Sequence, residues 1–474
     1  MKKLLFLILL LNVLLCRAQN KKDLSPPLTV IDAWIDAQKD YQDIPGISAG
    51  IVIDQELIWS KGYGFSDVSL KTKTTDSTIY SICSISKLFT AISIMQLRDQ
   101  GKLDLDDEIG QHLPWFNLQQ QFPESGPITI RSLLTHSSGV PRDSDFPYWA
   151  DPKFPFPTDK QFRKKLSGQK TLYPASTIYQ YSNLGMSLLG KVVSELSGIS
   201  YEEYVYENIL KPLGLKDTKP IMPDIKNARL AKGYSVISRD RKREELNHFQ
   251  AKSITPAAGF SSTVKDLAAF ASWHFKIREE IDNTVLNGNT LKEMQRVHWY
   301  EPGYSTTRGL GFGVYKKENV TLIGHAGECP GYLTSIKMVK DKKWAFIVMI
   351  NSLGVNYTNF IMSMYNIMNN YKNAQSVKTP NDLNLEDYSG KYYDLWDGDN
   401  LIIPWKGRLA IFSLKSKSLN GPHTIAKHIE GDKFKCVRQD GNLGADIKFE
   451  RDKNGKVIKY WIHSFYMEKI DANE

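Results

Sequence analysis

Ser84 and Lys87 are the residues of this 474-residue chain best placed to do chemistry. They stand three positions apart at the expected start of an amphipathic helix, in which apolar residues recur at Leu88, Ile92 and Met95. Residues three apart share a helix face, so the Lys87 amine would lie over the Ser84 hydroxyl and could accept its proton. The spacing predicts the nucleophile and the base of an acyl-transferring serine hydrolase.

The Ser-x-x-Lys spacing alone is not specific, because it also begins at Ser167 and at Ser262. Only Ser84 follows a short β-prone run, residues 77–83, that would deliver it to the free backbone N–H groups of a helix N-terminus. Such N–H groups suit a developing oxyanion. Ser262 precedes an ordinary helix start and Ser167 lies in a polar stretch, so we expect structural roles for both.

The elements expected around these residues place strands on both sides of a helical middle. We expect strands at 46–53, 56–64, 310–315, 320–323, 334–339 and 343–350, and helices at 30–41, 183–198, 201–213, 263–274 and 356–371. This order implies an α+β domain in which the terminal strands share one antiparallel sheet.

A second domain is expected after this one. The polar stretch 373–384 would link the first domain, residues 27–372, to residues 385–474. The last segment alternates polar and apolar residues between turns such as Asp440-Gly441-Asn442, which predicts a small all-β barrel or sandwich. It holds no catalytic constellation, so it could bind an envelope ligand or partner, or cover the cleft.

Residues 1–18 have the pattern of a secretory signal peptide. Two lysines precede an apolar run from Leu4 to Leu15, and a short cleavage site follows. We expect an exported protein, periplasmic or secreted, without a transmembrane span after signal removal, because the run is shorter than the ~20 residues that cross a bilayer. Lipid attachment at Cys16 is the less favoured alternative, since the bulky Leu15 stands where that signal prefers a small residue.

Composition excludes several other classes. The formal net charge is +9, but the basic residues are scattered and no nucleic-acid motif occurs, so we expect no nucleic-acid partner. The histidines show no ligand spacing, and we expect neither a metal nor another cofactor. Cys83, Cys329 and Cys436 form no paired framework. A bridge between Cys83 and Cys329 is conceivable in an oxidising compartment, yet we expect unpaired, half-buried thiols.

Two further segments carry groups that a serine hydrolase could use. Tyr181-Ser182-Asn183 begins an expected helix, and Gly324-His325-Ala326-Gly327-Glu328 lies on or beside an expected strand. Taken singly, Tyr181 would more often be a packed aromatic residue and Asn183 a helix cap. The ordered combination of Ser-x-x-Lys, Tyr-x-Asn and His-x-Gly is what is specific.

With these three motifs in this order, the chain resembles the serine β-lactamase-like and penicillin-binding superfamily. It is most similar to the branch of class C β-lactamases, D-peptidases, D-aminopeptidases and family VIII esterases, over roughly residues 27–372, with supporting strings at 128–139, 256–263 and 324–331. The resemblance implies an antiparallel sheet flanked by helices with an all-helical subdomain. It also implies acyl-enzyme hydrolysis of a small ester or a D-configured peptide or amide, with a β-lactamase or a D-Ala-D-Ala carboxypeptidase as alternatives.

Carried over residue by residue, the resemblance assigns roles to the first two motifs. Ser84 would be the nucleophile, Lys87 its base, and Tyr181 the relay that passes a proton to the leaving group. Asn183 would orient Lys87 and the substrate amide. A lysine can act as a base only if burial or neighbouring charges lower its pKa.

The third motif departs from that of β-lactamases. His325 and Ala326 stand where relatives that destroy β-lactams have a lysine and a threonine, so a permanent cation for a substrate carboxylate is missing from this segment; Gly327 completes the motif. The backbone N–H groups of Ser84 and Glu328 would form the oxyanion hole. The side chain of Glu328 would oppose an anionic substrate and favour a free amine.

Two expectations concern the surroundings of the site. Residues 145–157 contain five aromatic residues and four prolines, and could wall the acyl pocket or pack as a local cluster; we favour the wall. His136 is expected to be structural. A catalytically silent cell-envelope binding protein on the same fold is the alternative of another class, and the intact trio of motifs argues against it.

Overall fold

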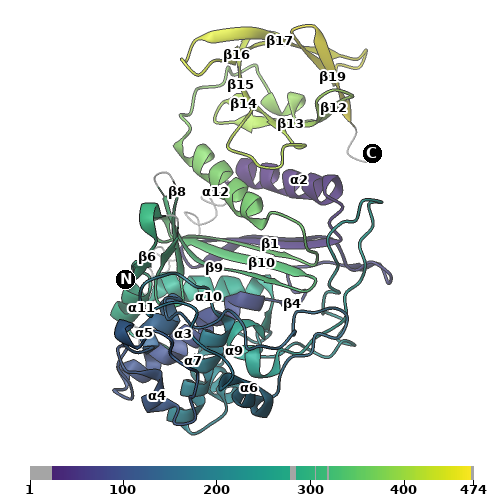
Figure 1. Ribbon diagram of the computed structural model, residues 1–474. Helices are drawn as coiled ribbons and strands as arrows, with labels where there is room; N and C mark the ends of the chain where they lie inside the picture. Colours follow the sequence, from purple (N-terminus) through teal and green to yellow (C-terminus); the bar gives the residue numbers. More distant parts are fainter. Residues whose placement is uncertain (1–23, 278–283, 305, 318–319, 471–474) are drawn as a thin grey trace, which may run out of the picture. The chain divides into compact units, whose positions relative to one another are not determined.

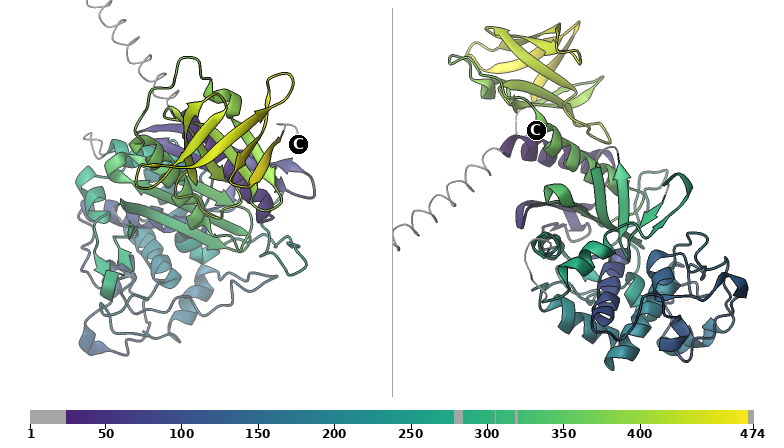
Figure 2. Two further views of the ribbon diagram at one scale, coloured as in Figure 1. Left: turned by 90° about the horizontal axis from the view of Figure 1, so that it is seen from above. Right: turned by 90° about the vertical axis from the view of Figure 1, so that its left-hand side faces the viewer.

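The computed structural model describes residues 24–277, 284–304, 306–317 and 320–470 (Figure 1). They divide into two compact units: residues 43–357, and a second unit that joins the described residues up to 42 to those from 358 onward. Figure 2 shows further views of both units. The predicted signal peptide, residues 1–18, lies outside the described residues. Within the described ranges, every helix is too short or too polar to cross a membrane.

A nine-stranded antiparallel sheet forms the centre of the 43–357 unit, in the order β3-β2-β1-β11-β10-β9-β8-β7-β6. Its strands are β1 (Gly46–Ile53), β2 (Glu56–Asp67), β3 (Thr72–Lys73), β6 (Trp299–Tyr300), β7 (Thr307–Arg308), β8 (Gly313–Lys317), β9 (Val320–Cys329), β10 (Tyr332–Val339) and β11 (Trp344–Ile350). Ile47 of β1 lies opposite Ile350 of β11. The first and last strands therefore share the sheet, as the order of the elements predicted.

Helices of the same unit form the predicted all-helical subdomain (Figure 1). α3 (Ser86–Asp99), α7 (Asn183–Ser197) and α9 (Thr255–Ala258) pack against one another, and α10 (Val264–Lys276) packs against β1, β2 and β11. α3 is buried from Ser86 to Leu97, which explains why its sequence is apolar on nearly every side. The remaining helices are α4 (Ile109–His112), α5 (Ile130–Thr135), α6 (Asp159–Leu166), α8 (Tyr201–Val205) and α11 (Gly288–Met294).

The second unit contains a closed β-barrel, which decides between the barrel and the sandwich predicted for the C-terminal segment. Its strands are β12 (Gly390–Asp394), β13 (Gly398–Trp405), β14 (Arg408–Ser413), β15 (Thr424–Glu430), β16 (Lys433–Val437), β17 (Leu443–Arg451), β18 (Val457–Ile462) and β19 (Phe465–Ile470). Side chains such as Tyr392, Phe434 and Phe449 fill the interior. The barrel is therefore a packed core, not a ligand cavity.

Two helices distant in sequence belong to the same unit as the barrel: α2 (Ser25–Tyr41) and α12 (Tyr357–Asn373). Trp34 of α2 donates its indole N–H to the Ser416 carbonyl at 2.8 Å, and Gln38 donates to the Leu414 carbonyl at 2.7 Å. The expected linker, 373–384, runs without helix or strand from residue 374 to 384. The domain limits 27–372 and 385–474 stay predictions.

Candidate active site

Ser84 lies in a tight turn between the sheet and the helical subdomain. The short strand β4 (Tyr80–Ser81) leads into a 3-10 turn, η1 (Cys83–Ile85), which runs directly into α3. Cys83 has a φ of 49°, and this left-handed conformation bends the chain just before the serine. The turn thereby brings the Ser84 hydroxyl to the N-terminal end of α3, as the sequence predicted.

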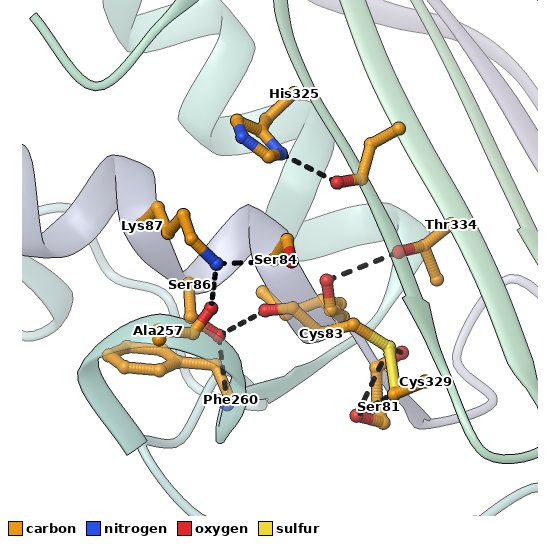
Figure 3. Close-up of a disulfide and its surroundings, with 12 residues drawn as sticks. Ser81, Cys83, Ser84, Ser86, Lys87, Ala257, Phe260, His325, Cys329 and Thr334 are labelled. Carbon is orange, nitrogen blue, oxygen red and sulfur yellow. Dashed lines mark hydrogen bonds between the residues drawn. A yellow bond between two sulfur atoms is a disulfide. The ribbon is translucent and has the colours of Figure 1, made fainter. Parts of the chain in front are cut away.

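The amine of Lys87 reaches the hydroxyl of Ser84. Nζ lies 3.1 Å from Ser84 Oγ, 2.8 Å from Asn183 Oδ1 and 2.7 Å from the Ala257 carbonyl oxygen. Figure 3 shows this amine between the serine and the chain around Ala257. Because the last two partners can only accept, they orient the amine and leave its remaining position facing Ser84.

The environment of Lys87 favours its neutral form. The side chain is fully buried, and burial is the main cause that holds the pKa of Lys87 well below its ordinary value. The charge of Arg142 lowers this pKa further, and that of Asp143 opposes the shift. A neutral amine beside Ser84 can accept the hydroxyl proton, so this lysine meets the condition for a general base.

Tyr181 covers the other side of the nucleophile. Its ring centroid lies 4.8 Å from Lys87 Nζ. Burial raises the pKa of Tyr181, and a hydrogen bond with Ser84 acts in the opposite direction. His136 packs against Tyr181 with ring centroids 4.5 Å apart and accepts a hydrogen bond from the Ser182 N–H at 3.2 Å. His136 therefore supports the phenol from behind, which fits the structural role expected for it.

Asn183 is held by a network that the sequence analysis missed. It is the first residue of α7, and the side chain of Ser182 caps that helix. The Asn183 amide donates to Asp143 Oδ1 at 2.8 Å, and Tyr148 donates its hydroxyl to the same carboxylate oxygen. Since the amide nitrogen faces a carboxylate, the amide oxygen is turned toward Lys87. Asp143 thus fixes the orientation of the residue that holds the base.

His325 lies on β9 as a buried, neutral imidazole. Burial is the main cause that holds the pKa of His325 well below its usual value; Lys87, whenever it is protonated, and Arg308 lower this pKa further. Its Nδ1 lies 2.6 Å from the Ala326 carbonyl, which can only accept, so the proton is on Nδ1. Nε2 is left as a hydrogen-bond acceptor.

Gly327 lies where β9 meets the nucleophile turn. A Cβ at this position would lie 2.2 Å from the carbonyl oxygen of Ile82 and 2.9 Å from Cβ of Cys83. Only glycine lets the strand approach the turn this closely. Glu328 is the next residue on the strand, and its side chain is exposed at the pocket. The two backbone segments predicted to form the oxyanion hole therefore meet at Gly327.

Cys83 and Cys329 form a disulfide, so the expectation of unpaired, half-buried thiols was wrong (Figure 3). Both residues are buried, and their Cα atoms are 5.8 Å apart although 246 positions separate them in sequence. Spacing could not reveal the pair, because the two residues meet only when β9 lies against η1. The bond joins the residue before Ser84 to the residue after Glu328.

A pocket of about 610 Å³ opens over Ser84. Five of the other predicted site residues line it, namely Tyr181, Asn183, His325, Gly327 and Glu328. Lys87 lies buried beside them. The structure therefore brings all the predicted site residues together.

Two arginines also line this pocket and provide permanent cations that the third motif itself lacks. Arg308 donates to the hydroxyls of Tyr179 at 2.7 Å and of Tyr315 at 3.0 Å, and Arg142 lies with its guanidinium 5.2 Å from the Tyr181 ring centroid. Because these cations come from outside the third motif, the sequence of that motif could not reveal them.

The aromatic loop 145–157 both walls the pocket and packs on itself. Trp149 and Phe154 line the pocket, as expected of a wall. Phe156 stacks on Tyr148 at 4.9 Å and on Phe249 at 5.5 Å between ring centroids. The stacked rings fix the loop that presents Trp149 and Phe154.

Sheet, helical subdomain and site together define an α+β protein of the β-lactamase-like class, with a barrel added at its C-terminal end. A family model described as Beta-lactamase matches residues 31–360, and the chain belongs to that family. It is 29% identical over 338 residues to Beta-lactamase-like protein 2 of Dictyostelium discoideum, a match that covers 69% of this chain and 59% of that protein. It is 25% identical over 328 residues to Protein flp of Staphylococcus aureus strain MW2, covering 68% and 62%. The match thus spans less than two thirds of either relative.

Solved structures share the fold. An octameric penicillin-binding protein homologue from Pyrococcus abyssi aligns with a TM-score of 0.64 at 24% identity, covering 93% of this chain and 100% of that one. A D-amino acid amidase from Ochrobactrum anthropi SV3 aligns with a TM-score of 0.58 at 22% identity, covering 70% and 94%. At these identities the likeness concerns the fold alone.

Proposed function

We propose that this chain is an exported serine hydrolase that acts through an acyl-enzyme on small esters or D-configured peptides and amides. The observation that carries the proposal is the position of the Ser84 hydroxyl, 3.1 Å from the buried amine of Lys87, in one pocket that Tyr181 also lines. Membership of the Beta-lactamase family supports it.

Acylation begins with attack of Ser84 Oγ on the substrate carbonyl carbon. The new C–O bond forms as the hydroxyl proton passes to the neutral Lys87 amine, and the carbonyl electron pair moves to oxygen. The backbone N–H groups of Ser84 and Glu328 hold the resulting oxyanion. Each such donor contributes on the order of 3 kcal/mol to the transition state.

Collapse of the tetrahedral intermediate breaks the bond to the leaving group. The proton held by Lys87 reaches that group through Tyr181, whose raised pKa keeps it a phenol able to donate as well as accept. The acyl-enzyme remains. Water then attacks the ester carbonyl, gives up its proton along the same route, and releases the acid while Ser84 recovers its hydrogen.

Export rests on the signal pattern of residues 1–18, with lipid attachment at Cys16 the less favoured variant. The Cys83–Cys329 disulfide supports it, because such bonds persist mainly in oxidising compartments.

A β-lactamase or D-Ala-D-Ala carboxypeptidase is the second candidate, since Arg142 and Arg308 line the pocket and could receive a substrate carboxylate. Glu328 at the same pocket favours a substrate with a free amine. A silent binding protein on this fold would need none of the contacts between Ser84 and Lys87.

The decisive experiment treats the mature protein with a fluorophosphonate and, separately, with a penicillin, and locates adducts by mass spectrometry. We expect adduct on Ser84, and ester turnover that Ser84→Ala abolishes. Ser167→Ala is the matched control, because Ser167 begins the same Ser-x-x-Lys spacing but is exposed and far from these contacts. Full ester turnover by Ser84→Ala would refute the mechanism. Rapid penicillin hydrolysis would favour the second candidate.

A further inference from the structure

One part of the outer barrel surface breaks the pattern of the rest. Many strand positions that point outward elsewhere on the barrel are polar, such as Asp446, Lys448 and Glu450 of β17, although Ile429, Leu443 and Ile458 are also exposed. At the tips of the β12–β13 and β18–β19 hairpins large aromatic or apolar side chains are exposed beside polar ones, namely Tyr393, Leu395, Trp396, Phe465 and Tyr466. A cluster of this kind on a soluble surface marks a binding site.

Strand register explains why these side chains share one face. Tyr393 of β12 lies directly opposite Glu468 of β19, while their neighbours Tyr392 and Met467 are buried in the barrel. Because successive strand residues alternate between faces, Tyr393 and Glu468 point outward, and so does Tyr466 two residues before Glu468. Two hairpins far apart in sequence therefore contribute to a single surface.

The turn that carries Trp396 is held in a fixed conformation. Asp394 Oδ1 accepts hydrogen bonds from the backbone N–H groups of Trp396 at 2.7 Å and of Asp397 at 2.6 Å, and Lys415 donates to the Trp396 carbonyl at 3.0 Å. Trp396 nevertheless keeps 80% of its surface exposed. Of the ten tryptophans, all within the described residues, it is the only one that is neither buried nor half-buried. Because the backbone of this turn is already ordered, binding at Trp396 costs less ordering of the chain.

The hairpin tips enclose a hollow of about 410 Å³ with a distinct chemistry. Aromatic rings line it together with the carboxylates of Asp394 and Glu468, and no lysine or arginine is among its lining residues. Lys459 pairs with Glu468 at 3.9 Å. The negative charge of Asp394 still disfavours the phosphates of nucleic acids and anionic lipids. A second copy of the chain, pairing through the same surface, would set these carboxylates against one another.

We propose that this hollow binds an uncharged oligosaccharide. Aromatic faces pack against the C–H faces of sugar rings, and carboxylates accept hydrogen bonds from sugar hydroxyls without needing a cation. The volume suits a few sugar units, whereas a stable protein partner would need roughly 800 Å² of surface on each side. The site lies on the barrel alone, so it is independent of the proposed hydrolysis.

The test uses the full-length mature protein carrying Ser84→Ala, so that no probe is turned over. Cellotetraose, chitotetraose and maltotetraose are titrated by calorimetry, with an oligogalacturonate of the same length as the anionic control. We expect at least one neutral tetrasaccharide to bind. Trp396→Ala should weaken binding about tenfold or more, Trp396→Phe should retain most of it, and Leu443→Ala, exposed on β17 outside the hollow, should leave it unchanged.

Several outcomes would overturn the proposal. The proposal is wrong if none of the neutral tetrasaccharides binds at about 10 mM, a concentration at which even very weak binding would be measured. It is also wrong if Trp396→Ala leaves binding intact, or if the protein prefers the oligogalacturonate. Self-association in analytical ultracentrifugation that Trp396→Ala abolishes, without sugar binding, would assign the surface to a second copy.

Discussion

Replacing Arg142 by glutamine should move the acidic limb of the pH–rate profile to higher pH. Lys87 acts as a base only when it is neutral, so kcat/KM should rise as pH increases through the pKa of Lys87 in the free enzyme. Burial and the charge of Arg142 both lower that pKa. Removing the Arg142 charge lets the pKa of Lys87 rise, and a higher pH is then needed to free the amine.

The structure sets the size of this shift. Lys87 Nζ lies 4.8 Å and the Arg142 guanidinium carbon 5.2 Å from the centroid of the same Tyr181 ring. The two charges are therefore at most about 10 Å apart, and at that separation they repel by roughly 1.7 kcal/mol at an effective dielectric constant of about 20, equivalent to somewhat more than one pKa unit. The Arg142 side chain is 57% exposed and lies 3.4 Å from Asp143, so solvent and this pairing reduce the effect. We expect a shift of about half a unit to one unit.

The assay measures kcat/KM from pH 5 to pH 10 with an uncharged chromogenic ester, so that Arg142 does not act through substrate charge. Arg142→Lys, which keeps the charge, is the matched control and should leave the limb in place. Asp143→Asn should move the limb the opposite way, because the charge of Asp143 raises the pKa of Lys87. An unmoved or lowered limb in folded Arg142→Gln would refute the assignment of Lys87 as the titrating base.

Three further outcomes follow from the site. Gly327→Ala should lower kcat by about a hundredfold or more at little cost in helix content by circular dichroism, since its Cβ would displace the nucleophile turn. The double change Cys83→Ala and Cys329→Ala should lower the free energy of unfolding in urea by about 2–5 kcal/mol, because the bond closes a long loop; an unchanged midpoint would contradict this. Glu328→Gln should raise the kcat/KM ratio of anionic over cationic acyl substrates and Arg308→Gln should lower it, and identical ratios in both variants would show that neither side chain selects by charge.

Helices and strands were predictable from the sequence where the local pattern of apolar residues matches the residues that are buried in the folded chain. The alternating segment 46–64 folds into β1 and β2 around Asp54, and the apolar run near 343–350 becomes β11. The helix expected at 183–198 ends one residue earlier, at Ser197, where Gly198 adopts a left-handed conformation. The helix expected at 201–213 instead continues beyond Val205 as a π-helical turn. Its amphipathic period could not distinguish the two helix types.

Charge around the site was not predictable from the motifs. Arg142 and Asp143 follow the string 128–139 after Val140 and Pro141, and this polar pair was the one local signal that could have identified them. Arg308 stands on a two-residue strand with no motif around it. Its place in the pocket depends on the sheet order, which brings β7 and β8 beside β9. Residues that act through long-range packing leave no periodic trace in the sequence.

The turn that carries Ser84 is held against β9 by the Cys83–Cys329 disulfide, which depends on the close approach of the strand at Gly327. Gly327 lets the strand approach the Ile82 carbonyl, and Thr334 of β10 donates its hydroxyl to the same carbonyl at 3.2 Å. Only at this approach are Cys83 and Cys329 close enough to bond. Gly327 is therefore needed to form the site itself, apart from any contact with the substrate. The backbone N–H groups of Ser84 and Glu328 can converge on one oxyanion only if β9 and the turn touch.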